Sequence, residues 1–362
     1  MIPCNNLLRS YQQYKDEFEQ AAIETLRSGW YILGKKDIEF EEEFARQMNS
    51  KHCISCDNAT NALFLGINAL NISDGDEVIV QSNTYIATVL GITRNGATPV
   101  FVEPNKFYNM SSDIEKYITS KTKAVLVTHL FGQATNMSEI QRLCNKYHIF
   151  LLEDCSQAHY AKYKGKKVGT IGKIGFFSFY PTKNIGAMGD AGCMVTDDDE
   201  LAAKLKSLRN YGSVARYDFQ LEGINSRMDE IQAALLLVRL KHAKEITNEK
   251  IHIAQRYLAS INNPLVKLPK VDTDCTSVWH LFVLEVDDRD RFVSYLKENG
   301  VGADIHYPIP PHLSGCYKRL GYKKGDFPIA EYYSEHIVDI PIFNGMRDEE
   351  IEKVIEVVNE YK

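Results

Sequence analysis

The sequence predicts an α/β fold whose sheet is mostly parallel. From about residue 52 onward, short runs rich in β-branched and other apolar residues alternate with segments of helical character. Strands that are apolar along almost their whole length are typical of a parallel sheet that helices cover on both faces. The expected strands are 77–80, 99–102, 124–130, 149–155, 175–180 and 192–196, and the helices between several of them are 60–70, 85–96 and 137–148.

The rest of the chain predicts a second, smaller α+β unit. A helix over 197–212 has an acidic start and a glycine stop, and a long helix from Met228 to about Ile261 leads out of the first unit. We therefore expect an N-terminal arm and large domain over residues 1–240, and a small C-terminal domain over 241–362. In the small domain the expected strands are 278–286 and 302–307, and the expected helices are 290–299 and 348–361.

Composition excludes several classes of function. The chain has 362 residues and a net charge of −6, and no run of Lys and Arg is long enough to build a basic face for nucleic acid. No apolar stretch approaches the roughly 20 residues that span a bilayer, and the N-terminus does not read as a secretory signal. We expect a cytoplasmic protein with reduced thiols. His52, Cys53 and Cys56 could form half of a zinc site, but nothing completes it, so no metal is expected.

Three features converge on the edge of the sheet where an open parallel fold binds its ligands, outside the carboxyl ends of the strands. Asp154 ends the strand 149–155, and Lys183 follows the strand 175–180. The residues 58–60 begin a helix, whose free N–H groups and dipole offer an anion site. Taken singly, Asp154 is expected only to cap the turn that follows it. Residues 58–60, taken singly, are expected only to cap the helix and to bind no ligand.

Lys183 carries the most specific chemistry. It follows a run of aromatic residues that breaks at a proline, and it opens a glycine-rich turn, FFSFYPTKNIGAMGDAG over 176–192. Partial burial lowers the pKa of a lysine and favours the neutral amine that Schiff-base chemistry needs. A carboxylate near a cationic heterocycle would keep that ring protonated, as a pyridoxal phosphate ring requires. The combination of Lys183, Asp154 and the helix start at 58–60 is far more specific than any one of these features.

The sequence resembles the sugar aminotransferases of the DegT/DnrJ/EryC1/StrS family over nearly its whole length. The resemblance implies the aspartate aminotransferase (type I) fold, with a seven-stranded, mostly parallel sheet in the large domain. The matching motifs occur in the family's order: SGWYILG (28–34), SNTYIATVLGI (82–92), THLFGQATNM (128–137), LLEDCSQAHYAKYKGKKVGTIG (151–172), FSFYPTKNIGAMGDAG (177–192), GINSRMDEIQAALL (223–236) and IHYPIPPHL (305–313).

The resemblance also implies a role for each matching residue. Lys183 would join the cofactor as a Schiff base and later carry the proton, and Asp154 would pair with the ring nitrogen. Gln157 would hydrogen-bond the ring hydroxyl oxygen, and Tyr85 would stack on the ring. The residues expected to hold the phosphate are Ala59, Thr60, Ser178 and, from the neighbouring subunit, Asn225, so that a homodimer would share its active sites.

The implied reaction is a ping-pong transamination that passes through pyridoxamine phosphate. Glutamate is the expected donor, and a nucleotide-linked keto-sugar is the expected acceptor, contacted by Tyr180, His306 and Tyr307. The motif SGWYILG favours dTDP-3-keto-6-deoxyhexoses, with amination at C3. The alternatives are a C4 aminotransferase on a dTDP- or UDP-4-keto-6-deoxy sugar, and a non-catalytic regulatory protein of the same fold, although the latter would be expected to lose Lys183 or Asp154.

One position departs from the family pattern. The turn at the start of the helix 60–70 usually holds glycine where this chain has Ala59, and Asp57 stands just before it. Alanine suits the first turn of a helix but not a turn with positive φ. We therefore expect a slightly different loop, with the charge of Asp57 directed away from the phosphate.

Overall fold

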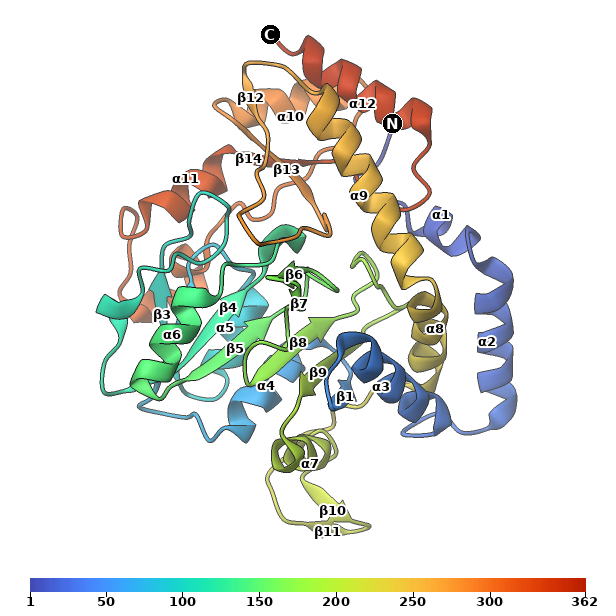
Figure 1. Cartoon of the computed structure of the whole chain (residues 1–362), viewed down its shortest axis with the longest axis vertical. Helices are drawn as coiled ribbons and strands as arrows, with labels where there is room; N and C mark the ends of the chain where they lie inside the picture. The colour runs from blue at the N-terminus through green and yellow to red at the C-terminus, as the bar shows by residue number, and fades with distance from the viewer.

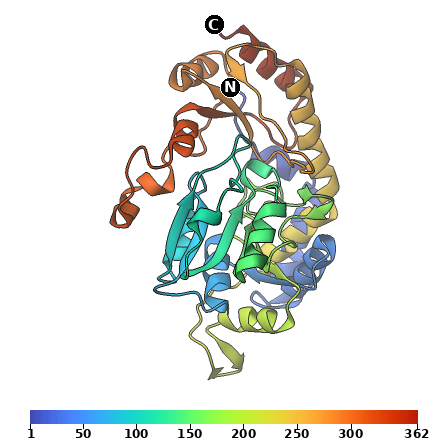
Figure 2. The same cartoon turned by 60° about the vertical axis from the view of Figure 1, so that its left-hand side comes forward.

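The computed structural model describes residues 1–362. Figure 1 shows a large unit built around one sheet and a smaller C-terminal unit that lies against one end of it. Both termini lie at the smaller unit, as Figure 2 also shows from another side. None of the helices is both long enough and apolar enough to cross a membrane.

The large unit contains a seven-stranded sheet of order β1-β9-β8-β5-β4-β2-β3. All neighbouring strands are parallel except at β9, which runs antiparallel to both β8 and β1. The mostly parallel sheet is thus confirmed. The strands are β1 (His52–Cys56), β2 (Glu77–Gln81), β3 (Thr98–Val102), β4 (Thr122–Thr128), β5 (Phe150–Asp154), β8 (Ile174–Ser178) and β9 (Gly192–Thr196).

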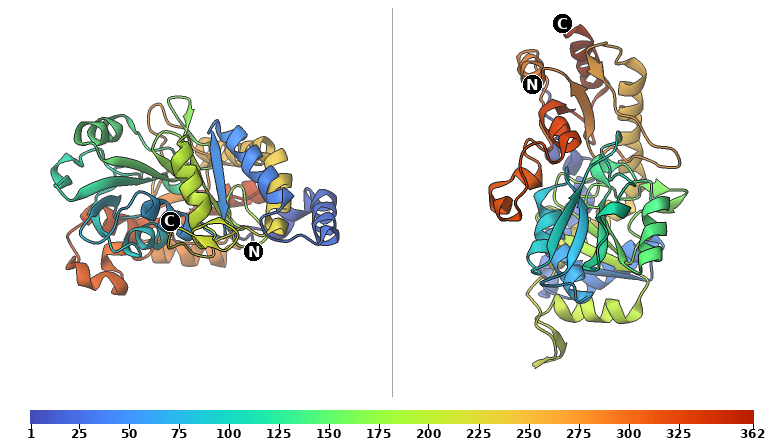
Figure 3. Two further views of the ribbon diagram at one scale, coloured as in Figure 1. Left: turned by 90° about the horizontal axis from the view of Figure 1, so that it is seen from below. Right: turned by 90° about the vertical axis from the view of Figure 1, so that its left-hand side faces the viewer.

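Helices cover both faces of this sheet, as the two views of Figure 3 show. Successive strand residues point to opposite faces, so one core contains Ile79 and Val125 and the other contains Val78 and Ala124. Apolar side chains of the covering helices complete each core. The helices are α3 (Lys35–Met48), α6 (Ser138–Tyr147) and α8 (Glu230–Lys241) on the first face, and α4 (Ala59–Ala69), α5 (Ile86–Thr93) and α7 (Asp199–Leu208) on the second.

The smaller unit has its own core around a three-stranded antiparallel sheet of order β12-β13-β14. The predicted domain boundary falls at the end of α8 and stays a prediction. The elements are α9 (Ala243–Ser260), β12 (Val266–Lys267), β13 (Phe282–Val286), α10 (Arg289–Glu298), η3 (Pro311–Leu313), η4 (Gly315–Leu320), α11 (Pro328–His336), β14 (Ile337–Ile340) and α12 (Asp348–Glu360).

The N-terminal arm reaches across to this smaller unit. Ile2 forms a parallel bridge with Val301, and the guanidinium of Arg9 donates to Glu350 at 2.8 Å. The arm contains α1 (Leu7–Gln12) and α2 (Lys15–Ser28), and the second helix packs on α8. The remaining short elements are η1 (Glu115–Tyr117), η2 (Leu130–Gly132), β6 (Lys162–Tyr163), β7 (Lys166–Lys167), β10 (Ser213–Ala215) and β11 (Asp218–Phe219).

Two sequence expectations about elements were wrong, and one strand was missed. The helix expected from Met228 to Ile261 is two helices, because His242 leaves helical geometry (φ −103°, ψ 10°) between α8 and α9. The stretch 302–307 is not a strand, since only Asp304 pairs, with Asp339, before the chain turns toward the cavity described below. The segment His52–Cys56, considered only as part of a metal motif, is the edge strand β1.

Candidate active site

A cavity of about 660 Å³ lies at the carboxyl ends of the parallel strands, between the large and small units. Such a volume is typical of a small-molecule site. Eight of the residues singled out from the sequence line it: Ala59, Thr60, Tyr85, Ser178, Tyr180, Lys183, His306 and Tyr307. They come from four separate parts of the chain, which only the folded topology brings together.

The turn after β8 delivers Lys183 to the cavity. The strand ends at Ser178, and the N–H of Lys183 donates to the carbonyl of Tyr180 at 2.8 Å, which closes the turn. Burial lowers the pKa of Lys183 from its usual range to about 8, although the negative charge of Asp154 works in the opposite direction. A substantial fraction of this amine is therefore neutral just above neutral pH, as nucleophilic attack on a carbonyl carbon requires.

Asp154 ends β5 and is almost fully buried. Its Oδ2 accepts a hydrogen bond from the Thr88 hydroxyl at 2.7 Å, and its Oδ1 accepts from the Ser156 N–H at 3.0 Å. Each carboxylate oxygen retains a free lone pair, because a carboxylate offers about four acceptor sites. Asp154 is thus held firmly but can still accept a proton-bearing nitrogen.

Gln157 forms hydrogen bonds with both the large unit and the small unit. Its Oε1 accepts from the Phe131 N–H at 2.6 Å, and its Nε2 donates to the Tyr307 hydroxyl at 3.0 Å. The ring of Tyr307 packs on that of Tyr85, with centroids 4.9 Å apart, while Tyr85 remains 50% exposed. An aromatic ring left this exposed above a cavity offers a surface on which a flat ligand can stack.

The start of α4 forms the floor of the cavity beside Lys183. Asn58 caps the helix through its Oδ1, which accepts from the Asn61 N–H at 2.8 Å, so the earlier N–H groups of the first turn have no intrahelical acceptor. Ala59 is the first helical residue and does not have positive φ. The alanine therefore fits this turn without strain.

Asp57 is held at the side of this helix start. Its carboxylate accepts from the Asn61 side chain at 2.8 Å and from the Ser226 hydroxyl at 2.5 Å. It does not line the cavity. Gly192, at the start of β9, allows the close approach of that strand, because a Cβ there would lie 2.7 Å from the Ala59 nitrogen.

His306 faces the cavity from the small unit with its Nδ1 bonded to the buried Asp339 carboxylate. Burial opposes protonation of the ring, but the hydrogen bond and the charge of Asp339 outweigh it, so the pKa of His306 is raised. This imidazole is thus held by Asp339 at the wall of the cavity.

Asp154 and Gln157 do not line the cavity but are buried on either side of Ser156, which does. Asn225 differs from all the other predicted residues. It is exposed, it forms a bridge with Asn210, and it does not line the cavity of its own chain. Sequence reasoning also missed cavity residues: Arg94, Asp190 and His280 line it as well. No local motif marks them, because they reach the site only through the packing of α5, the turn after Lys183 and the approach to β13.

Residues 12–359 match the DegT/DnrJ/EryC1/StrS aminotransferase family. The chain belongs to this family. A relative named dTDP-3-amino-3,6-dideoxy-alpha-D-galactopyranose transaminase, from Aneurinibacillus thermoaerophilus, is 47% identical over 363 residues, which cover 100% of this chain and 99% of the relative. The predicted family and its enzyme class are confirmed.

Solved structures of DegT/DnrJ/EryC1/StrS proteins have the same fold. The X-ray structure of DesV from S. venezuelae superposes with a TM-score of 0.97 at 38% identity and covers 99% of this chain and 98% of that chain. The putative sugar aminotransferase Spr1654 from Streptococcus pneumoniae, in its PLP-form, gives a TM-score of 0.91 at 26% identity and covers 95% of each chain. The predicted fold is confirmed, and the predicted cofactor agrees with the PLP- and PMP-forms of Spr1654.

The residues present fit the pyridoxal phosphate that the family implies. The start of α4, with the Thr60 and Ser178 hydroxyls, offers the N–H and O–H donors that a phosphate needs. Tyr85 offers a ring face, Asp154 a carboxylate for a ring nitrogen, and Lys183 an amine of lowered pKa. All of these groups except Asp154 line one cavity, and Asp154 is bonded to the lining residue Ser156, so that together they could hold the cofactor.

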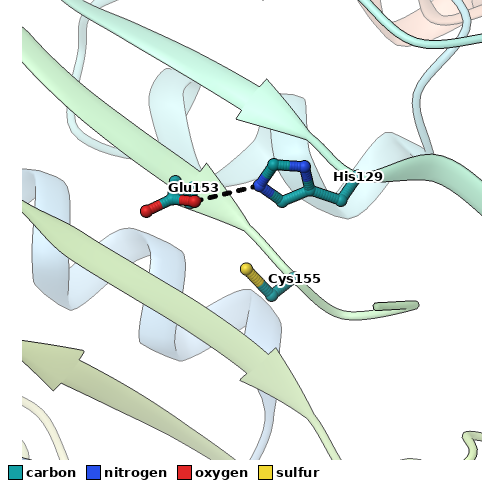
Figure 4. A group of neighbouring side chains, drawn as sticks. All are labelled: His129, Glu153 and Cys155. Carbon is teal, nitrogen blue, oxygen red and sulfur yellow. Dashed lines mark hydrogen bonds and ion pairs between the residues drawn. The ribbon is translucent and has the colours of Figure 1, made fainter. Parts of the chain in front are cut away.

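A second group of ionisable side chains, His129, Glu153 and Cys155, lies on the other side of β5 (Figure 4). Glu153 accepts from the N–H groups of Gly169, Ile171 and Gly172 and lies 3.1 Å from His129 Nε2. Burial raises the pKa of the Cys155 thiol well above its usual range, so the thiol is not ionised. Hydrogen bonds already occupy the group, which anchors the loop before β8.

Proposed function

We propose that the protein transfers an amino group to C3 of a dTDP-3-keto-6-deoxyhexose, with glutamate as donor, to give a dTDP-3-amino-3,6-dideoxyhexose. The observation that carries this proposal is the 47% identity, over the full length of both chains, to a transaminase named for a dTDP-3-amino-3,6-dideoxy sugar. The substrate motif SGWYILG over 28–34 supports the same carbon.

The chain's own groups have distinct tasks in this reaction. Pyridoxal phosphate, when bound, supplies an aldehyde for the amine and a ring that delocalises negative charge. Asp154 holds a proton on the ring nitrogen, and Gln157 donates to the ring hydroxyl oxygen. Lys183 takes the proton from the α-carbon of glutamate and, in the second half-reaction, delivers a proton to C3 of the sugar. Its pKa of about 8 suits both directions of transfer.

Three residues orient the sugar. Tyr180 of the large unit and His306 of the small unit line the cavity with a hydroxyl and an imidazole, and Tyr307 is fixed by Gln157. Hydrogen bonds from such groups to the sugar's ring oxygens and hydroxyls would select which carbonyl carbon faces Lys183. An analogue that leaves them unpaired would be rejected strongly.

We propose a homodimer in which Asn225 of one chain contacts the cofactor phosphate in the active site of the other chain. Asn225 is exposed and stands outside its own cavity. Near it, the hairpin of β10 and β11 projects from the molecule (Figure 1), with Tyr217 79% exposed and Phe219 also exposed. Trp30 and Tyr31 are exposed on the N-terminal arm as well. Aromatic side chains are enriched in protein interfaces, so a second copy of this chain is the occupant that we propose.

The substrate proposal is tested by incubating the purified protein with glutamate and, in parallel, with dTDP-3-keto-6-deoxyglucose, its galacto epimer and 4-keto-6-deoxy sugars. NMR then identifies the carbon that carries nitrogen in the product. Amination of a 3-keto sugar alone supports the proposal, whereas amination at C4 replaces it with the C4 reaction.

Loss of the amine tests whether the protein is an enzyme at all. The purified wild-type protein should be yellow and should bleach with glutamate, since the donor converts the bound cofactor to its amine form. Lys183→Ala should lose the covalently held colour and the activity. A wild-type protein that neither colours nor bleaches, despite retaining Lys183 and Asp154, would instead indicate the regulatory alternative.

A further inference from the structure

Lys250 is a buried cation that the proposed reaction does not use. It lies on α9, and only 2% of its surface is exposed. Its ammonium donates to the Asn184 side-chain oxygen and to the His280 carbonyl, both at 3.1 Å. Both acceptors are neutral, so these bonds do not offset the cost of burying the charge as a carboxylate would. Such an arrangement is uncommon without a function.

The two acceptors connect Lys250 directly to the candidate site. Asn184 follows Lys183 in the chain, and its Nδ2 donates to the Val278 carbonyl at 2.7 Å. His280 lines the cavity, is 6% exposed, and leaves its Nδ1 without a partner. Lys250 therefore joins α9, the turn that carries Lys183 and the segment before β13 at a single point.

We propose that Lys250 is a positioning residue for Lys183: it anchors the turn behind Lys183, and its amine competes with the Lys183 amine for one proton. This inference rests on the proposed function of Lys183. Two ammonium groups in a partly buried site repel each other, so the pair favours one positive charge over two near neutral pH. A charge on Lys250 makes a second charge on Lys183 less favourable and so increases the fraction of Lys183 amine that is neutral and free to attack.

The charges around Lys183 agree with this competition. Burial, together with the charge of Lys183, lowers the pKa of Lys250 to about 7, and the charge of Glu249 acts in the opposite direction. Burial likewise lowers the pKa of Lys183 to about 8, and Asp154 opposes this. The ionisable groups that face Lys183 from the surrounding elements are Asp154, His159, Asp190, Lys250, His280 and His306.

Three variants of Lys250 separate charge from anchoring. Lys250→Arg keeps a charge that does not titrate in this range, whereas Lys250→Gln and Lys250→Met have none. The titration midpoint of Lys183 should therefore be lowest in Lys250→Arg, intermediate in the wild type and highest in the two neutral variants. The span should be roughly one pH unit, as expected for two charges in a partly buried site. Lys244→Gln, an exposed position on the same helix, serves as the control and should match the wild type.

The midpoint can be measured without relying on activity. Cyanate reacts with neutral amines, so the apo-protein is treated with cyanate between about pH 6 and 9, and mass spectrometry follows the peptide that contains Lys183. In the reconstituted protein, the pH titration of the visible absorption band instead reports the protonation of the nitrogen that joins Lys183 to the cofactor, and the charge of Lys250 should shift this midpoint in the same order. Thermal unfolding confirms that each variant is folded.

The inference is supported if the Lys183 midpoints of the folded variants follow the order Lys250→Arg, wild type, then the two neutral variants. Equal midpoints in the arginine, wild-type and glutamine proteins, or a reversed order, overturn the inference. A wild-type protein that fails to bind pyridoxal phosphate would overturn the proposed function, but the cyanate profile of Lys183 would still test the competition with Lys250.

Discussion

Glu153 and Asp154 are neighbours on β5, yet their surroundings assign them opposite uses. Glu153 points to one face of the sheet, where three backbone N–H groups donate to it and His129 lies within hydrogen-bond distance. Asp154 points to the other face, accepts two hydrogen bonds and lies near Lys183. Alternation along a strand sends adjacent side chains to different environments.

The comparison shows how to distinguish a structural carboxylate from a functional one. Every acceptor position that Glu153 can offer is directed at protein donors, so it holds the loop 168–172 and has nothing left for a ligand. Asp154 is equally buried but incompletely bonded, and it accepts from the N–H of Ser156, which lines the cavity. Burial alone does not indicate function; unused hydrogen-bonding capacity beside a cavity does.

The largest expected effect is that of Asp154→Asn on catalysis. Asparagine has the same shape: its oxygen can accept from the Ser156 N–H, and its NH₂ group can donate to the Thr88 hydroxyl oxygen, so the fold should be preserved. It carries no charge to hold a proton on a ring nitrogen, and kcat should fall by about 10³-fold. Steady-state kinetics and the absorption spectrum of the bound cofactor measure this. An active Asp154→Asn protein with an unchanged spectrum would remove Asp154 from the proposed role.

The matched change on the other face, Glu153→Gln, should act on stability instead. An amide has one oxygen, so its NH₂ group would face backbone N–H donors that then lack acceptors. The free energy of unfolding should decrease by about 2–4 kcal/mol, measured by urea denaturation. The folded fraction should keep kcat within a few-fold of the wild type. A large loss of kcat at normal stability would contradict the distinction drawn between the two acids.

A third carboxylate, Asp339, should make the stability of the fold depend on pH through His306. It raises the pKa of His306 in the folded protein, so the protonated ring stabilises the fold below the unfolded value of about 6.5. This contribution is lost as the pH rises through the pKa that His306 has in the folded protein. Unfolding free energies of the wild type and His306→Gln should therefore differ most near pH 6 and progressively less toward pH 9. His252→Gln, exposed on α9, should show no such trend.

The smallest expected effect is that of metal removal. The group of His129, Glu153 and Cys155 is close enough to hold an ion, but the Glu153 oxygens are occupied and the Cys155 thiol is protonated. Treatment with EDTA should leave the Tm and the kcat unchanged, and added zinc should not raise the Tm. Stoichiometric metal in the purified protein, lost together with stability on chelation, would contradict this.

Much of the site could be predicted because its signals are local in the chain. Lys183, Asp154 and Thr60 each follow or begin a regular element, and parallel strands bring their carboxyl ends to one edge. Lys250 and His280 could not be predicted, since a lysine on an amphipathic helix normally faces solvent and a histidine beside β13 normally packs in a core. The break at His242 was equally invisible, because the residues on both sides favour helix.

The sequence by itself determined the alternation of apolar strands and helices, the family and the residue types that surround a cofactor, because these depend on short-range periodicity and on motifs within a few residues. The tertiary structure alone decided which face each acid of β5 occupies, that Asn225 stands outside its own cavity, and that α9 places a second amine behind Lys183. Those outcomes depend on packing between segments far apart in the chain, where burial and hydrogen bonding determine what a side chain can do.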